Sequence, residues 1–315
     1  MRTIYPLQDA TETLQNTVVA VGVFDGVHRG HQEILTQTVR EAKSQGLTPV
    51  ALTFDIHPEE MFRPEKSPPY IASLTQRASL IDTYGGGIET VAIARFDPTY
   101  AALSPEAFVS DILETCLGAG HVLVGADFRY GRHRAGSVTT LLEAGARSGF
   151  TVTVVPPILI NGDRVSSTQI RGLVSSGDLP AAIDLLGHPF VVEGVVTQGK
   201  QLGRTLGYPT ANLHPTQPRQ LLPGNGVYAA YAHLASGQKV RAAVSVGTNP
   251  TTDTDDARKV EAFLMDGFSG DLYGQEFALD FREKVRDEQK FSGLDALISQ
   301  MALDVNNIAE RLPEP

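Results

Sequence analysis

The pattern of apolar residues changes near residue 186, and this change limits the fold more than any other feature of the chain. Before it, short β-branched runs alternate with stretches in which apolar residues recur at helical spacing. After it, strand-like runs follow one another with turn residues between them. One repeating architecture does not produce both patterns. The sequence therefore predicts two domains, residues 1–186 and 187–315, with the boundary at residues 186–190.

The first half predicts an α/β fold with a doubly wound, Rossmann-like parallel sheet. Residues 18–24 are apolar throughout, as expected for a strand that is buried on both faces. Residues 31–43 carry one apolar helical stripe, and Gly46 is suited to end that helix. Further strand-like runs lie at residues 49–54, 90–96, 122–128 and 151–155. Strands and helices in this alternation form parallel sheets with right-handed crossovers.

The second half predicts a small antiparallel β-barrel followed by a C-terminal helix. Its strand-like runs are residues 191–197, 226–234, 239–246, 260–265 and 276–281. Ser236 and Gly237 are typical of a tight hairpin turn between two of these strands. Ser292 and Asp295 are spaced like a capping box, so the last helix is expected to begin there.

Composition narrows the classes of protein to consider. The formal net charge of −10 argues against a general nucleic-acid binder, which normally has a basic face. No apolar run is long enough to span a membrane, and the first residues do not resemble a secretory signal. Cys116 is the single cysteine, which favours a reducing compartment, and its helical position favours core packing. We therefore expect a cytoplasmic protein, and a homo-oligomer is compatible with the sequence.

The most informative motif is GVFDGVHRGH, residues 22–31, which connects the first strand to the first helix. His28 and His31 are three residues apart, so both can project from the first turn of that helix. Amide groups at a helix N-terminus together with two imidazoles suit the phosphates of ATP. The candidate phosphate-binding residues here also include Gly22, Phe24, Asp25, Gly26 and Gly30. The alternative is a surface turn with two solvated histidines.

Two later segments lie where the same site would be completed. The run GADFRYG, residues 125–131, ends the fourth predicted strand and contains Asp127 and Phe128. Ser167 and Thr168 begin a helix after the fifth strand, with Arg171 one turn further on. Hydroxyls, amides and a guanidinium in this arrangement suit phosphate oxygens. The alternative role of Asp127 is to cap a turn.

A second motif, GKQLGRTLGYPTANL, occupies residues 199–213 and does not match a Walker loop. Thr210 and Asn212 are two residues apart on an extended segment, so their side-chain oxygens point the same way. Such oxygens suit Mg²⁺ that is shared with ATP phosphates. The remaining candidate ATP-binding residues are Gly199, Lys200, Gly203, Arg204, Gly207 and Pro209.

These motifs carry a resemblance that covers nearly the whole chain. G-x-FDGVH-x-GH, VG-x-DFRYG and SST-x-IR resemble the FMN adenylyltransferase module of prokaryotic bifunctional FAD synthetases, and GRTLGYPTAN resembles their riboflavin kinase module. The resemblance implies Mg-ATP held by His28, His31, Ser167, Thr168 and Arg171, with Asp127 and Phe128 near the nucleotide or flavin. It also implies metal and phosphate contacts for Thr210 and Asn212.

The resemblance further implies that Glu261 is the base of the kinase, in the segment KVEAFLMD of residues 259–266. The alternative role for Glu261 is an exposed strand carboxylate. Arg286 is implied as a flavin contact. Two residues depart from the family pattern, because Phe263 stands where histidine is expected and Thr252 where an aromatic residue is common.

The implied function is ATP-dependent phosphorylation of riboflavin to FMN, followed by adenylylation of FMN to FAD with release of pyrophosphate. The implied partners are riboflavin, FMN, FAD and ATP, without nucleic acid or membrane, and the implied cofactor is Mg²⁺. Three alternatives remain open. The first is that only one of the two modules is active. The second is that the chain is a non-catalytic flavin sensor, and the third is that it adenylylates another phosphate-bearing acceptor.

Overall fold

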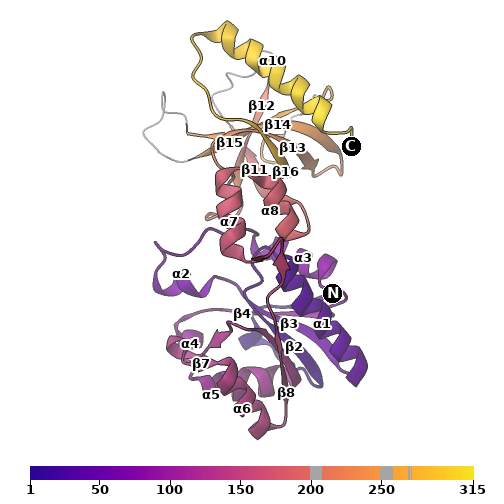
Figure 1. The fold of residues 1–315 in the computed structure, drawn as a ribbon, viewed down its shortest axis with the longest axis vertical. Coiled ribbons are helices and arrows are strands. Elements are labelled where there is room, and N and C mark those ends of the chain that lie inside the picture. Colours follow the sequence, from indigo (N-terminus) through magenta and orange to yellow (C-terminus); the bar gives the residue numbers. More distant parts are fainter. Residues whose placement is uncertain (199–207, 249–257, 269, 271) are drawn as a thin grey trace. The chain divides into compact units, whose positions relative to one another are not determined.

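The computed structural model describes residues 1–198, 208–248, 258–268, 270 and 272–315. The chain forms two compact units. The first comprises Met1–Pro68 and Leu74–Ser166, and the second comprises Pro69–Ser73 and Ser167–Pro315. Figure 1 shows the chain coloured from indigo at the N-terminus to yellow at the C-terminus.

A six-stranded parallel sheet forms the centre of the first unit. In spatial order its strands are β1 (Arg2–Ile4), β4 (Thr90–Ala94), β3 (Thr48–Phe54), β2 (Thr17–Val21), β5 (Ala119–Gly125) and β8 (Thr151–Val155). Every residue of β2 is buried, because helices cover both faces of the sheet. The predicted doubly wound parallel sheet is confirmed.

Two helices cover each face of this sheet. Apolar residues of α1 (Arg29–Gln45) and α3 (Leu74–Tyr84) pack on one face, and those of η2 (Phe108–Cys116) and α6 (Val138–Ser148) pack on the other. Cys116 lies half-buried against the second of these cores, as predicted. The remaining elements are η1 (Leu7–Asp9), α2 (Pro58–Phe62), α4 (Pro98–Ala101), α5 (Pro105–Ala107), β6 (Arg129–Tyr130), η3 (Arg132–Arg134), β7 (Gly136–Ser137), β9 (Leu159–Ile160) and β10 (Asp163–Arg164).

Strand β2, which corresponds to the first predicted strand, is shorter than predicted because the backbone turns soon after it. It ends at Val21 because Phe24, which the apolar pattern assigned to the strand, has a φ of 51°. Such a φ turns the backbone out of the extended conformation. At the other end of α1, Gly46 adopts the left-handed conformation with a φ of 68°, so the predicted helix end is confirmed.

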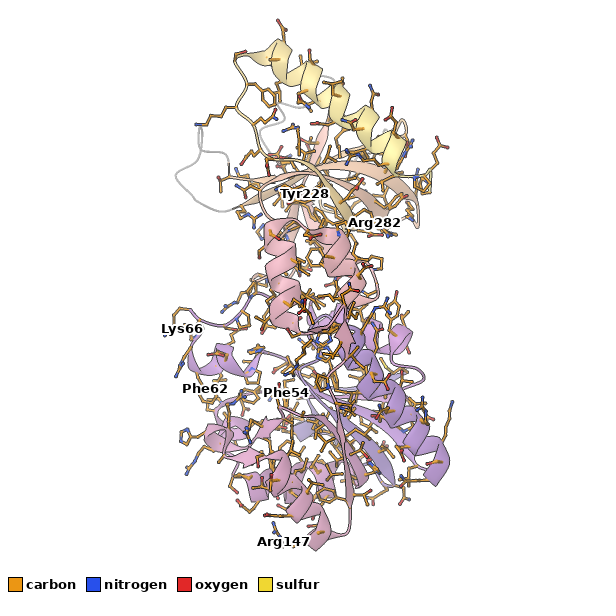
Figure 2. All side chains as sticks on the ribbon, in the orientation of Figure 1. Phe54, Phe62, Lys66, Arg147, Tyr228 and Arg282 are labelled. Carbon is orange, nitrogen blue, oxygen red and sulfur yellow. The ribbon has the colours of Figure 1, made fainter. Side chains whose placement is uncertain are left out.

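The second unit contains a closed antiparallel barrel, which confirms the other half of the predicted fold. Its strands, in spatial order, are β11 (Phe190–Thr197), β12 (Thr210–Pro215), β15 (Lys259–Leu264), β14 (Lys239–Gly247), β13 (Gly226–Leu234) and β16 (Glu276–Arg286). Tyr228, labelled in Figure 2, is fully buried, and its ring lies 5.8 Å from that of Phe281. Gly237, in the hairpin turn between β13 and β14, has a φ of 85°.

The helices described beside the barrel are α7 (Ser167–Ser176), α8 (Leu179–Leu186) and α10 (Leu294–Arg311). In Figure 1, α10 is the yellow helix over the barrel strands, and Ile308 packs there with Tyr231 and Met265. The predicted capping box is wrong, because the N-cap is Gly293 and no side chain caps it. The helix therefore begins one residue later than Ser292 would require.

Residues 69–73 and 167–186 belong to the barrel unit, although the change in apolar pattern lies at residue 186. The backbone N–H of Tyr70 donates to the carbonyl of Arg219, and the N–H of Leu221 donates to the carbonyl of Tyr70, at 2.8 Å each. Helix α8 contacts β11 and β16. The predicted boundary near residue 186 remains a prediction about the functional modules.

Candidate active sites

The turn between β2 and α1 has an unusual backbone. Phe24, Gly26 and Val27 all have positive φ angles, of 51°, 76° and 37°. Phe24 and Val27 are fully buried, so their side chains hold this conformation in place. Positive φ is costly for a β-branched residue and persists only where the surroundings enforce it, most often at functional sites.

His28 and His31 form a stacked pair at the start of α1. His28 is the N-cap residue, and its Nδ1 accepts a hydrogen bond of 3.3 Å from the backbone N–H of His31. The two imidazole rings are 3.6 Å apart and 14° from parallel, and the edge of Phe24 packs against His31. The helix turn thus brings both histidines to one place, beside the N–H groups of the first turn.

Two glycines of the motif leave room for these rings. A Cβ at Gly30 would lie 3.1 Å from Cε1 of His28, and a Cβ at Gly22 would lie 3.0 Å from the ring of Phe24. Both approaches are closer than ordinary van der Waals contact. Asp25, between them in the sequence, is 2% exposed. The motif is therefore a compact turn with little free space.

The other residues predicted for this phosphate site follow β5 in the sequence. The carboxylate of Asp127 forms an ion pair with Arg164, although more than half of the Asp127 side chain is exposed. The ring of Phe128 stacks on Tyr130 at 5.6 Å. Ser167, Thr168 and Arg171 lie on α7, in the second unit, where Arg171 Nε donates to the carbonyl of Pro69 at 2.7 Å.

The barrel brings the predicted kinase residues together through strand register. Asn212 on β12 lies directly opposite Glu261 on β15, and Thr210 lies opposite Phe263. The side chains of Val260, Ala262 and Leu264 are buried, so Glu261 faces away from the barrel interior. Two strands that are about fifty residues apart in the sequence thus place three candidate residues on one face.

Burial raises the pKa of the Glu261 carboxyl above its ordinary value, and the nearby Lys259 ammonium partly opposes this effect. Removal from water disfavours the charged form of a carboxyl. Ser245 on β14 lies opposite Glu261 on the other side. The sequence motifs did not identify Lys259 or Ser245 as neighbours of Glu261. Ser245 is identified by the strand register, and Lys259 by its effect on the pKa of Glu261.

Phe263, where the resemblance predicted histidine, packs its ring 5.1 Å from that of Tyr208. The aromatic pair lies beside the face that carries Thr210 and Glu261. Five predicted ATP-binding residues and Thr252 lie outside the described residues: Gly199, Lys200, Gly203, Arg204 and Gly207. Pro209, the last of that set, is described and precedes β12 directly.

Arg286 at the end of β16 is bound to the C-terminal helix. Its Nε and Nη2 donate to the carboxylate of Asp304 at 2.7–3.0 Å, and Gln300 also donates to this carboxylate. The Asp304 side chain is 5% exposed. The guanidinium that was predicted as a flavin contact is therefore held by α10.

The barrel face has the donor chemistry that Mg²⁺ prefers. Thr210, Asn212 and Glu261 offer hydroxyl, amide and carboxylate oxygens on neighbouring strands. Within the described part of the chain, no group of three or more His, Cys, Asp or Glu side chains forms a cation cage. Mg²⁺ usually has few protein ligands and completes its shell with water and substrate phosphates, so this oxygen set fits it.

Both sites are suited to chemistry at phosphorus. A helix N-terminus with two imidazoles can neutralise a developing pyrophosphate, and a desolvated carboxylate beside oxygen donors can activate a hydroxyl next to a triphosphate. The fold and the two sites thus define a two-module transferase of nucleotidyl and phosphoryl groups.

Family comparisons identify both halves. Residues 10–169 match the family model described as FAD synthetase, and residues 186–312 match the one described as riboflavin kinase. The chain belongs to the family of bifunctional riboflavin kinase/FMN adenylyltransferases. It phosphorylates riboflavin to FMN with ATP and then transfers AMP from ATP to FMN, which yields FAD and pyrophosphate.

The relatives cover nearly the whole chain. The enzyme of that name from Escherichia coli strain K12 is 37% identical over 96% of this chain and 95% of its own length. The enzyme from Pseudomonas fluorescens is also 37% identical, over 97% and 96%. A crystal structure described as a macrolide-efflux protein from Streptococcus pneumoniae has a TM-score of 0.84 at 29% identity and covers 99% of both chains. None of the described helices is both long and apolar enough to cross a bilayer.

Proposed function

We propose that the two reactions take place at two separate Mg-ATP sites, one at the turn that carries His28 and His31 and one on the barrel strands that carry Asn212 and Glu261. The observation that carries the kinase half is the register that sets Asn212 opposite Glu261. The observation that carries the adenylyltransferase half is the stacked pair of His28 and His31 at the N-terminus of α1. The roles proposed for the individual residues rest on these two arrangements.

In the kinase site, Glu261 accepts the proton of the ribityl 5′-hydroxyl of riboflavin. The hydroxyl oxygen forms a bond to the γ-phosphorus of ATP, the bond to the bridging oxygen breaks, and ADP leaves. Burial of the Glu261 carboxyl supports this role, because a raised pKa makes the ionised form a better base. Thr210 and Asn212 would hold Mg²⁺, which would neutralise charge on the phosphates.

In the adenylyltransferase site, a phosphate oxygen of FMN attacks the α-phosphorus of ATP, and pyrophosphate leaves. His28, His31 and the N–H groups of α1 stabilise the negative charge that develops on the leaving group. The resemblance also implies phosphate contacts for Ser167, Thr168 and Arg171, which belong to the barrel unit. No side chain acts as a nucleophile, so catalysis consists of positioning and charge neutralisation.

The test separates the flavins formed from riboflavin, ATP and Mg²⁺ by chromatography. Glu261→Ala should stop FMN formation but still convert supplied FMN to FAD. The double variant His28→Ala with His31→Ala should form FMN and no FAD. Matched controls are Glu276→Ala, at an exposed glutamate on β16, and His214→Ala, at an exposed histidine on β12. Normal FAD formation by the double histidine variant would refute the adenylyltransferase site. Normal FMN formation by Glu261→Ala would refute the kinase site.

The same proposal covers the cellular setting. We infer a cytoplasmic enzyme without nucleic-acid or membrane partners, and the single cysteine and the net charge of −10 support this. A homo-oligomer is compatible with the proposal, and light scattering of the purified chain measures its state. Cell fractionation that places the chain mainly in a membrane fraction would refute the proposed location.

A further inference from the structure

Arg77 on α3 has the largest fully buried side chain among the described residues, and neither proposed reaction uses it. An arginine stays charged at any pH that a protein experiences. Burying a charge is costly unless hydrogen bonds and partial charges replace the water that is lost. The position of its partners therefore shows what this charge holds together.

Three hydrogen-bond acceptors of Arg77 lie at the ends of two neighbouring strands. Its Nη1 donates to the carbonyls of Val23 and Phe54, at 3.0 and 2.7 Å, and to Oγ1 of Thr53 at 3.2 Å. Thr53 Oγ1 itself donates to the carbonyl of Val23 at 2.9 Å. Nη1 carries two hydrogens, so its three acceptors share them. Phe54, labelled in Figure 2, is the last residue of β3.

These bonds begin where the sheet ladder stops. The last paired residues of β2 and β3 are Val21 and Leu52, and beyond them the N–H of Gly22 still donates to the carbonyl of Leu52. Val23 has left the strand, and its carbonyl is the last one before the positive φ of Phe24. Arg77 thus ties the start of the strained turn to the end of β3, in place of the sheet hydrogen bonds.

We propose that Arg77 is a positioning residue for adenylyl transfer, which acts by fixing the turn that presents His28 and His31. The inference rests on the proposed adenylyltransferase site. An apolar side chain of similar length could fill the same space, but it would leave the carbonyls of Val23 and Phe54 without this donor. The turn would then lose its anchor to β3, and a displacement of about 1 Å at a reacting centre costs on the order of 100-fold in rate.

The variant Arg77→Met keeps the length of the side chain and removes the donor. We expect kcat for conversion of FMN to FAD to fall about 100-fold, with a much smaller change in KM for ATP. Riboflavin phosphorylation by the same preparation should stay at the wild-type rate, because the kinase residues lie in the other unit. Arg77→Lys, which restores a charged donor, should recover at least part of the lost kcat.

Arg40→Met makes the same substitution at an exposed site on α1 and should leave both activities unchanged. The melting temperature of each variant is measured beside its kinetics. The inference is overturned if Arg77→Met keeps the wild-type kcat for FAD formation. It is also overturned if Arg77→Lys folds normally yet is as slow as Arg77→Met, or if both variants lose rate only in proportion to the fraction unfolded at the assay temperature.

His28→Ala is assayed in the same series to separate two failures. If His28→Ala is slow and Arg77→Met is not, the site assignment holds and only the positioning role fails. If both variants form FAD at the wild-type rate, the proposed site itself is wrong.

Discussion

Glu261 and Lys259 lie two residues apart on β15, and both are only partly buried beside a buried Val260. Side chains two apart on a strand point to the same face. The ammonium of Lys259 therefore opposes the rise that burial causes in the pKa of the Glu261 carboxyl. The two effects together set the pH at which the proposed base becomes ionised.

We predict that Lys259→Met moves the acidic limb of the pH profile for riboflavin phosphorylation to higher pH. Without the cation, burial acts unopposed, the pKa of Glu261 rises further, and less of the carboxyl is ionised at a given acidic pH. The measurement is kcat/KM for riboflavin across the acidic range. Lys43→Met, at an exposed lysine of α1, is the control. An unchanged limb in Lys259→Met would mean that Glu261 is not the titrating base.

At the scale of single residues, the candidates that belong to sequence motifs could be identified from the sequence. The other candidates could be identified only from strand register or burial in the folded structure. Thr210, Asn212 and Glu261 were identified from the sequence, and the barrel places Asn212 opposite Glu261. Arg77 was not identified, because arginine side chains are mostly exposed and no motif in the sequence marks this one as buried. Its role depends on two strand ends that only the folded sheet brings near α3.

Among the elements, α10 is attached to the barrel by an apolar contact and by ion pairs, of which the contact between Arg286 and Asp304 is the more buried. The bidentate ion pair of Arg286 with Asp304 is nearly excluded from water, and Gln300 donates a further hydrogen bond to the Asp304 carboxylate. A carboxylate that accepts a bidentate guanidinium is held more firmly than one in an exposed ion pair. This contact therefore fixes the end of β16 against the last helix.

We predict that Asp304→Ala lowers the free energy of unfolding of the barrel unit by about 3 kcal/mol, because it leaves the Arg286 charge partly buried without its carboxylate. Urea denaturation followed by circular dichroism measures the change. Asp295→Ala removes an exposed carboxylate from the first turn of the same helix and should cost less than about 1 kcal/mol. Equal losses in the two variants would contradict a special role for the Arg286 contact.

The type of each of these elements was predictable, but their ends were less so. The pattern of residues 226–234 predicted β13 without error, because turn residues bound it on both sides. The start of α10 was misplaced, because Ser292 resembles a cap that the chain does not use. Strand β2 was drawn too long, because Phe24 is as apolar as the strand before it and its positive φ leaves no mark in composition.

For the whole molecule, apolar periodicity predicted the two kinds of fold, but it did not predict which helices belong to which compact unit. Helices α7 and α8 have an ordinary helical pattern that continues the first half of the sequence, yet they belong to the barrel unit. Apolar spacing indicates that a segment is a helix. It does not indicate which core that helix packs against, because either core offers an apolar surface.

We predict that α7 and α8 lose hydrogen-exchange protection together with the barrel. In Asp304→Ala, amides of residues 167–186 should exchange faster along with those of β16, while amides of β2 and β3 keep the wild-type rate. Cooperative units open as a whole, so shared contacts imply shared protection. Mass spectrometry of peptic fragments provides the measurement. Faster exchange in β2 with unchanged α7 would contradict the grouping.

Residues 69–73 have a consequence for how such a chain can be divided. This short segment hydrogen-bonds with residues 219–221, although the sequence before and after it belongs to the parallel-sheet unit. A single cut in the backbone anywhere between residues 73 and 219, made by a protease or in the gene, thus separates residues 69–73 from the fragment that contains the barrel. An excised barrel fragment that begins at residue 187 would need residues 69–73 supplied as a separate peptide to restore its native pairing.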